Sequence, residues 1–565
     1  MKKGKPPDMN SSIDVSSPDY DVIVVGAGFA GLYTVQKLTQ QGLSIRCFEA
    51  GSDVGGTWFW NKYPGAQCDV ESLEYSYGFS EKLQQDWQWS RRFAGQSEIL
   101  AYANHVADQF DLRQHIEFNT RVRSAEYVED SGLWRLQVSA DRQVSARFLI
   151  LGTGNLSAPR VPDIPGLDDF KGKWFHSSRW PDDGVDFAGK RVAVIGTGST
   201  GIQIIPTVAE TAQKLLVFQR SPNFVVPAQN KQLDADFVKA YKARYPEMRR
   251  TAQQSQYGVA DLPVPTKSAL EVTPEEREQR YEELWQFGSH TAFMTAFNDL
   301  LLNIDANGTA ADFVRRKILA TVADRGTAEA LSAFDHPLGA RRLCAGTDYY
   351  KTFNRSNVTL VNVREAPIET FTEKGLRCGG VEHAFDIVVF ATGFDAMTGA
   401  LREIDIRGRG GLPLTEKWTE GPLTYLGMTV SGFPNMFIIT GPGSPSVKSN
   451  VILSIEQHVD WIARCLDDLH ALGTNTIEAQ ADAEADWVKH VNDVAEPTLY
   501  VKTNSWYTGA NVPGKPRVFM PYVGGIGTYR RICDEVAREN YRGFHLSSIG
   551  ERASHSSALT AGSLG

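Results

Sequence analysis

Two copies of a strand–glycine loop–helix pattern most constrain how this chain can fold. An apolar run at 22–25 leads into GAGFAG at 26–31, and a second run at 192–195 leads into GTGSTG at 196–201. Three glycines or small residues in such a loop allow a tight turn, close approach of the backbone to a pyrophosphate, and close helix–strand packing. We therefore expect an α/β fold with two dinucleotide-binding, Rossmann-like domains.

The residue that follows each unit's second strand indicates which nucleotide that unit binds. Glu49 lies 18 residues past Gly31, where a carboxylate can accept hydrogen bonds from ribose hydroxyls. Arg220 lies 19 residues past Gly201, where a guanidinium can pair with a 2′-phosphate. The first unit is thus predicted to bind a flavin dinucleotide and the second to prefer NADPH over NADH. The alternative for Arg220 is an ordinary surface arginine.

An aromatic loop, GGTWFWNKYPGAQCD at 55–69, comes shortly after Glu49. Its position favours contact with a planar flavin ring over an aromatic-stapled surface loop. Asp69 is a lone carboxylate in these surroundings, and such a group usually has a cationic partner. The adjacent Arg341 and Arg342 are candidates, although such pairs more often form a solvated basic spot.

Two further strand–turn patterns, ending at 152–154 and 391–393, indicate crossings between domains. We expect the FAD-binding domain at 19–152 and 393–546, with the NADP-binding domain at 153–225 and 336–392 inserted in it. Residues 226–335 are expected to be a helical insertion, with helices at 274–288 (Thr273 as N-cap) and 310–323. A small antiparallel meander is expected at 115–150 and a long helix from 451. Residues 1–18 and 547–565 are expected to be a disordered leader and tail.

Composition narrows the function classes. The net charge of −9 over 565 residues argues against a general nucleic-acid surface. Six cysteines without a Cys-x-x-Cys pair or zinc spacing fit free thiols in a reducing cytosol, and leave out dithiol flavin reductases and a metal site. We see no signal peptide and no run of about 18 apolar residues, so we expect a cytoplasmic protein without a membrane span.

A motif between the two glycine loops identifies a family. The residues of this motif, FxGxxxHxxxWP, are Phe170, Gly172, His176, Trp180 and Pro181. They resemble the fingerprint of the type I Baeyer–Villiger monooxygenases, and the GGxW, YPG and Asp69 elements of the aromatic loop resemble that family's second signature. The similarity runs from about Tyr20 to Leu546 and is closest to the phenylacetone and steroid monooxygenase type. The alternatives are a flavin N- or S-oxygenating monooxygenase or uncoupled NADPH oxidase, which the WP ending disfavours, and a catalytically silent FAD-binding scaffold.

The resemblance implies that NADPH reduces FAD, that a C4a-peroxyflavin forms with O2, and that cyclic, aryl or bulky steroid-like ketones become esters or lactones. Arg342 matches the family's essential arginine and Asp69 the carboxylate that positions it. His176 is expected to couple the linker to domain motion. The resemblance implies a ketone and O2 as partners, with no nucleic acid and no membrane, and we expect a monomer.

The resemblance and the motifs together give the remaining site residues. Lys448 stands where an apolar residue is expected. The residues predicted to contact substrate are Pro445, Ser446, Val447 and Lys448. The residues predicted to bind the cofactors are Gly26, Gly28, Ala30, Gly31, Glu49, Gly56, Thr57, Trp58, Trp60, Tyr75, Val122, Gly196, Thr197, Gly198, Ser199, Thr200, Gly201, Gln203, Arg220, Ser221, Arg341 and Trp506.

Overall fold

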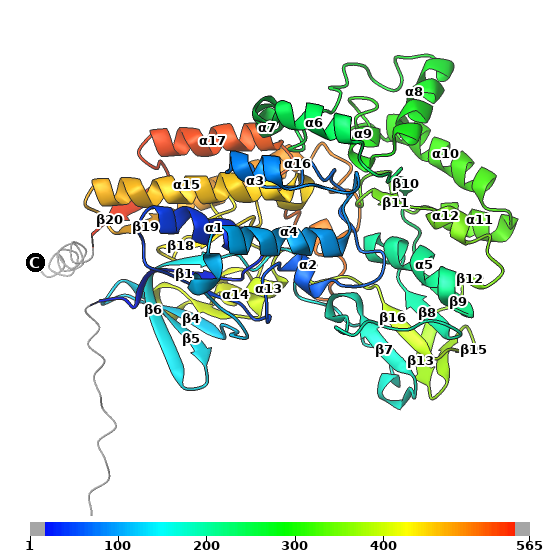
Figure 1. Cartoon of the computed structure of the whole chain (residues 1–565), viewed down its shortest axis with the longest axis horizontal. Coiled ribbons are helices and arrows are strands. Elements are labelled where there is room, and N and C mark those ends of the chain that lie inside the picture. The colour runs from blue at the N-terminus through cyan, green and yellow to red at the C-terminus, as the bar shows by residue number, and fades with distance from the viewer. Residues whose placement is uncertain (1–16, 549–565) are drawn as a thin grey trace, which may run out of the picture.

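Two separate β-sheets organise the chain, as the two glycine loops predict (Figure 1). The computed structural model describes residues 17–548, so most of the leader predicted at 1–18 and of the tail predicted at 547–565 lies outside it. In Figure 1 the first sheet lies at the left, below α1 (Phe29–Gln40) and α15 (Val451–Ala471). The second lies at the right, beside α5 (Ser199–Thr211).

The first sheet has the strand order β17-β4-β5-β6-β1-β2-β3, with β18 also paired to β6. Its strands are β1 (Tyr20–Val25), β2 (Ile45–Phe48), β3 (Ile116–Glu117), β4 (Ser124–Val128), β5 (Leu133–Ser139), β6 (Arg142–Leu151), β17 (Asp405–Arg407) and β18 (Met436–Ile438). β1 pairs in parallel with β2 and β6, whereas β4, β5 and β6 form the predicted antiparallel meander.

Strand β1 is apolar and buried from Val22 to Val25 because both faces of its sheet are covered. Val22 and Val24 pack into a core shared with α1, α4 (Gln96–Gln109) and α15. Ile23 and Val25 pack on the opposite face against the meander. Helix α15 begins where predicted, because the Asn450 side chain accepts the Ile452 N–H at 3.2 Å.

The second sheet is parallel throughout, in the order β12-β9-β8-β16-β7. Its strands are β7 (Lys173–His176), β8 (Arg191–Ile195), β9 (Lys214–Gln219), β12 (Val358–Asn362) and β16 (Ile387–Phe390). The fingerprint segment therefore provides the edge strand β7. Gly172 is needed at its start, since a Cβ there would lie 2.4 Å from the Asp386 carbonyl oxygen and 2.3 Å from the Phe170 ring. His176 Nε2 lies 3.2 Å from the carbonyl oxygen of Gly393, at the second predicted crossing.

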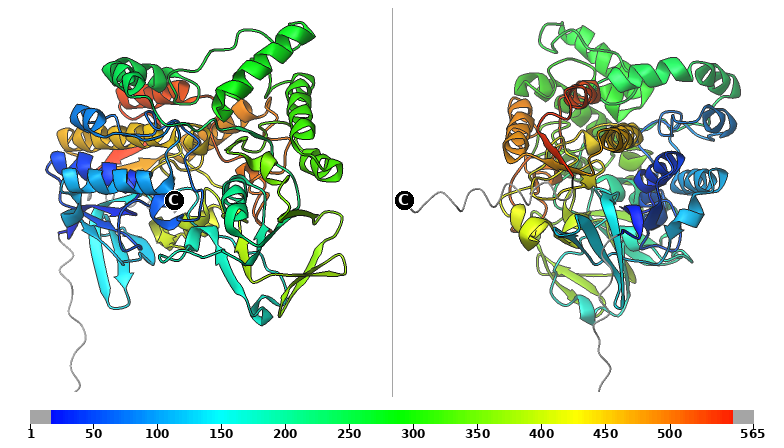
Figure 2. Two further views of the ribbon diagram at one scale, coloured as in Figure 1. Left: turned by 45° about the vertical axis from the view of Figure 1, so that its right-hand side comes forward. Right: turned by 90° about the vertical axis from the view of Figure 1, so that its left-hand side faces the viewer.

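The segment 226–335 is largely helical, as predicted, and Figure 2 shows its helices in green along one side of the molecule. They are α6 (Ala235–Ala243), α7 (Tyr245–Gln254), α8 (Pro274–Phe287), α9 (His290–Met294), α10 (Ile304–Thr321) and α11 (Arg325–Ser332). Thr273 caps α8 with Glu276, which confirms the predicted start. Helix α10 begins earlier than the predicted 310, because Asn303 caps it. No helix within residues 17–548 is long and apolar enough to cross a membrane.

The second glycine loop provides a matched pair of substitutions. A Cβ on Gly201 would lie 2.1 Å from the Gly196 carbonyl oxygen, whereas one on Gly198 would meet nothing within 4 Å. Gly201→Ala must force α5 away from the sheet, so we expect it to lose about 2 kcal/mol of stability. Gly198→Ala should keep the wild-type value. Thermal unfolding followed by circular dichroism at one heating rate measures both, and equal midpoints for the two variants would contradict this account of the helix–strand contact.

Candidate active site

The two glycine loops converge on one cavity of about 2140 Å³. The predicted cofactor residues that line it are Gly26, Gly28, Ala30, Glu49, Gly56, Thr57, Trp58, Trp60, Tyr75, Val122, Gly196, Thr197, Gly198, Ser199, Thr200, Gln203, Arg220, Ser221, Arg341 and Trp506. Gly31 and Gly201 do not line it; both are buried at helix–strand contacts, which is the packing role expected of a third glycine.

The first nucleotide site is built around Glu49, at the carboxyl end of β2. One of its carboxylate oxygens accepts the Ala27 N–H and the other the Gly51 N–H, both at 2.7 Å. Burial raises the pKa of Glu49, and these N–H groups oppose the rise. A Cβ on Gly28 would lie 3.3 Å from the Gly56 Cα, so the glycine loop and the aromatic loop meet backbone to backbone. A buried carboxylate that lines a glycine-walled cradle fits the adenosine half of FAD.

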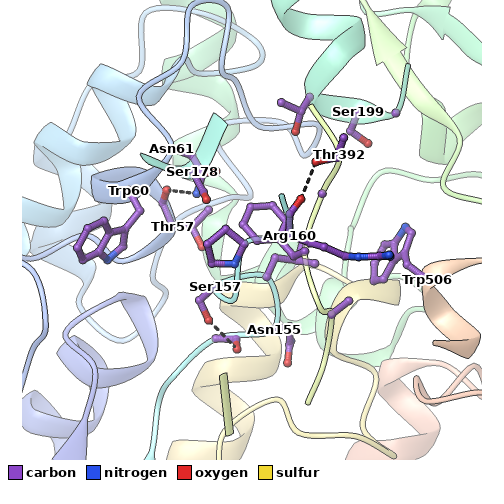
Figure 3. A pocket seen from close by; sticks show the side chains of 18 of the residues that line it. Thr57, Trp60, Asn61, Asn155, Ser157, Arg160, Ser178, Ser199, Thr392 and Trp506 are labelled. Atoms are coloured by element: carbon purple, nitrogen blue, oxygen red, sulfur yellow. Dashed lines mark hydrogen bonds between the residues drawn. The ribbon is translucent and has the colours of Figure 1, made fainter. Parts of the chain in front are cut away.

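The aromatic loop forms the adjoining wall. Its short helix α2 (Thr57–Trp60) places Trp58 in the cavity wall, where the indole N–H donates to the Tyr75 hydroxyl at 3.2 Å. Figure 3 shows Trp60 and Trp506 on opposite sides of the pocket, with Arg160 between them. These flat side chains fit a planar ring system, as the sequence predicts for the flavin.

Arginines gather at the carboxyl ends of β9 and β12. Arg220 and Ser221 follow β9, and Arg364 follows the neighbouring strand β12. Asp335 accepts from Arg364 at 2.5 Å and lies 3.3 Å from Arg341. Burial acts to raise the pKa of Asp335, but a hydrogen bond from His336 and the guanidinium groups of Arg341 and Arg364 hold it well below its ordinary value. This concentration of guanidinium groups beside the second glycine loop fits a nucleotide with a 2′-phosphate.

Arg364 and Asp335 are absent from the predicted residues. Neither lies near a motif, and the parallel pairing of β12 with β9 is what brings Arg364 beside Arg220. The position of Arg364 just past a strand was a signal in the sequence, but its use required knowing which strands are neighbours in the sheet. Arg160 and Thr392, near the two predicted crossings, are also cavity residues that were not predicted; the Thr392 hydroxyl donates to the Arg160 carbonyl at 2.6 Å (Figure 3).

Asp69 and Arg342 meet at the junction of the two nucleotide sites. The Arg342 Nη2 atom lies 3.2 Å and its Nε atom 3.4 Å from one Asp69 carboxylate oxygen. The Asp69 side chain is 7% exposed and that of Arg342 is 30% exposed, so the guanidinium can face a ligand while its partner is buried. Burial raises the pKa of Asp69 and Arg342 opposes that rise. Asp69 in turn keeps the pKa of Arg342 above its ordinary value, although burial acts against the charge.

The loop that carries Trp506 is tied to the arginine cluster. The Nε–H of Arg341 donates to the carbonyl oxygen of Asn504 at 3.1 Å, and Trp506 begins the short helix η6 (Trp506–Thr508). Arg341, which lies beside the expected phosphate, therefore also holds the loop of Trp506, and this loop forms another part of the cavity wall.

The predicted substrate segment is only partly at the cavity. Val447 lines it, whereas Pro445 and Ser446 are buried outside the lining. Lys448 lies between two lining residues, with its ammonium 4.0 Å from the centre of the Tyr500 ring. Of the fingerprint, Trp180 lines the cavity, and the residues that do not are Phe170, Gly172, His176 and Pro181.

The chain is similar to known flavin enzymes along most of its length. Residues 19–237 match the family described as flavin-binding monooxygenase-like. A Baeyer–Villiger monooxygenase of Pseudooceanicola batsensis is 44% identical over 93% of this chain and 95% of its own. A phenazine N-monooxygenase of Lysobacter antibioticus is 40% identical over 95% of this chain and 98% of its own.

Solved structures of such enzymes superpose on almost the whole chain. An oxidized steroid monooxygenase bound to NADP is 50% identical with a TM-score of 0.90, over 94% of this chain and 99% of its own. The OTEMO complex with FAD and NADP is 42% identical with a TM-score of 0.91, over 94% of this chain and 100% of its own.

The arginine cluster predicts how the cofactor is selected. Arg220→Ala removes a charge-assisted partner of a 2′-phosphate, so we expect KM for NADPH to rise about tenfold and KM for NADH to change little. Steady-state kinetics with both nucleotides measure this. Arg355→Ala, which removes an exposed arginine just before β12, at the other end of the strand from Arg364, is the control and should behave as wild type. An equal rise in both KM values for Arg220→Ala would contradict the assignment.

Proposed function

Since this chain belongs to the flavin-binding monooxygenase-like family and is a Baeyer–Villiger monooxygenase that uses FAD and NADPH, we propose that its ketone is oxygenated beside Arg342. The observation that carries this proposal is the Asp69–Arg342 pair, a half-exposed guanidinium held by a buried carboxylate at the junction of the two nucleotide sites. The overall reaction converts ketone, O2, NADPH and a proton into ester or lactone, NADP+ and water.

Arg342 is the cation of the reaction site. Bound FAD, once reduced by NADPH, supplies the chemistry that activates O2. As oxygen adds to the substrate, the carbonyl oxygen gains negative charge, and a fixed guanidinium stabilises that charge without reorganising. Asp69 keeps the guanidinium charged and oriented through the oxygen that accepts from Arg342. The second Asp69 oxygen is buried and has no hydrogen-bond partner among residues 17–548.

The two cofactors would occupy opposite ends of the cavity. Glu49 and the first glycine loop hold the adenosine of FAD, and the aromatic loop contacts the flavin ring. The second glycine loop and the arginine cluster hold NADPH. The loop bearing Trp506 closes over the nicotinamide and excludes water, and Arg341 transmits phosphate binding to it through Asn504.

Several further properties belong to the same proposal. The proposal includes the domain boundaries expected from the sequence. The strand positions support them, because the strands of the first sheet come from 20–151 and 405–438 and those of the second from 173–219 and 358–390. O2 is the second substrate, the ketone is cyclic, aryl or bulky, and the protein is a cytoplasmic monomer. His176 couples the fingerprint strand to the crossing at Gly393.

The similarity to a phenazine N-monooxygenase favours N-oxygenation as a second candidate activity.

Product analysis tests the function directly. The FAD-loaded enzyme is supplied with NADPH and O2 together with phenylacetone, a steroid ketone or phenazine. We expect ester or lactone in a one-to-one ratio with consumed NADPH for at least one ketone. N-oxide from phenazine without any ester would instead support the second candidate, and hydrogen peroxide as the only product would support an uncoupled oxidase.

Substitution of the ion pair tests the role of Arg342. Loss of one electrostatic stabiliser typically costs about 10²–10³ in rate, so we expect Arg342→Ala to lose ester formation to that extent while NADPH oxidation continues and yields hydrogen peroxide. Leaving Asp69 buried and unpaired costs about 3–5 kcal/mol, so the variant is paired with Asp69→Asn/Arg342→Ala, which removes both charges. A double variant that folds and still makes ester at the wild-type rate would refute the assignment.

A further inference from the structure

Lys448 lies between two residues that line the cavity, and it has no anionic partner among residues 17–548. It ends the short helix η5 (Ser446–Lys448), and its neighbours Val447 and Ser449 line the cavity. The side chain is half-buried. Among residues 17–548, no carboxylate lies within 4.0 Å of its ammonium, and the ammonium makes no hydrogen bond. An ammonium taken out of water in this way is costly unless something compensates for it.

Two tyrosine rings compensate in part. The Lys448 ammonium lies 4.0 Å from the centre of the Tyr500 ring and 4.6 Å from that of Tyr507, and both rings are buried. Cation–π contact of this kind favours a cation but accepts none of its three N–H hydrogen bonds. The aromatic pair therefore holds the ammonium in place and leaves its donors available to a ligand.

The charges around Lys448 do not balance. Burial lowers the pKa of Lys448, and the nearby Arg342 lowers it further. Both cations also act on His290, whose pKa burial holds well below its ordinary value, so this histidine is neutral. Burial raises the pKa of both tyrosines, which keeps them neutral as well. Asp69 is the anion of the group and is already paired with Arg342.

We propose that Lys448 binds a carboxylate on the substrate, so that the preferred ketone is a keto acid. This inference rests on the proposed function, because it places the carboxylate of a ketone on Lys448 while Arg342 serves the carbonyl. The bound carboxylate accepts the free ammonium donors and supplies the missing negative charge. The preference should be large, because a neutral ester accepts only weaker hydrogen bonds from the ammonium and supplies no negative charge to balance it.

Paired substrates test the inference in the FAD-loaded enzyme. Keto acids with a terminal acetyl group, from levulinate upward in chain length, are compared with their methyl esters under NADPH and O2. For the chain length that fits, we expect kcat/KM to favour the acid by about tenfold or more, the usual effect of a charge-assisted hydrogen bond. Lys448→Met should abolish this ratio and Lys448→Arg should retain part of it. The control variant Lys502→Met removes an exposed lysine close to Tyr500 in the sequence and should keep the wild-type ratio.

A binding measurement gives a readout that does not depend on turnover. Calorimetry of the oxidised FAD-loaded enzyme, in buffers of different ionisation enthalpy, reports protons taken up with the ligand. Burial and Arg342 lower the pKa of free Lys448, and a bound carboxylate would raise it again, so binding of the acid should be accompanied by net proton uptake and binding of the ester should not. Lys448→Met should lose the uptake with the acid, and Lys502→Met should retain it.

The outcomes separate the inference from the proposed function. If neutral ketones and methyl esters are oxygenated but the acid is not preferred, or if Lys448→Met keeps the preference and the proton uptake, the inference is overturned while the monooxygenase function stands. If no ketone of either kind is oxygenated, the proposed function fails. Proton uptake with the acid in the wild type, lost in Lys448→Met, would then still show a carboxylate site at Lys448.

Discussion

The structure depends on how it keeps buried charges paired. Asp69 belongs to the loop that leaves the first sheet, and Arg342 lies just before β11 (Cys344–Gly346), beside the second. Their contact joins residues 273 positions apart in sequence, at the place where the two nucleotide sites meet. Asp69 is the buried partner, and leaving its charge unpaired costs several kcal/mol. The pair therefore couples the formation of the reaction site to the correct docking of the two halves.

The same principle organises the phosphate end of the cavity. Arg220, Arg341 and Arg364 would repel one another without an anion, and Asp335 supplies one between two of them. One carboxylate, Asp335, thus holds arginines at the phosphate end of the cavity, and another, Asp69, holds Arg342 where the two nucleotide sites meet, before a ligand arrives. Such preorganisation lowers the cost of binding a phosphate and of stabilising charge during the reaction.

Sequence reasoning located cavity residues where the signal is local. Both glycine loops, Glu49, Arg220 and the aromatic loop follow a strand by a fixed interval, so each could be placed from spacing alone. The arginine partner of Asp69 required more: the demand of a buried carboxylate for a cation, together with the family resemblance. Arg364 and Asp335 could not be found, because they enter the site through strand order and through the end of the helical insertion.

The fingerprint segment shows a different limit. Its residues identify the family, yet four of the five do not line the cavity. These residues have packing roles instead. Gly172 leaves room for the Phe170 ring and the Asp386 carbonyl at the start of β7, and His176 contacts the crossing at Gly393. The edge strand they form is parallel to β16, which leads into that crossing. A movement of this strand would therefore pass to the connection between the two sheets, and this is how we propose that a motif outside the cavity affects the reaction inside it.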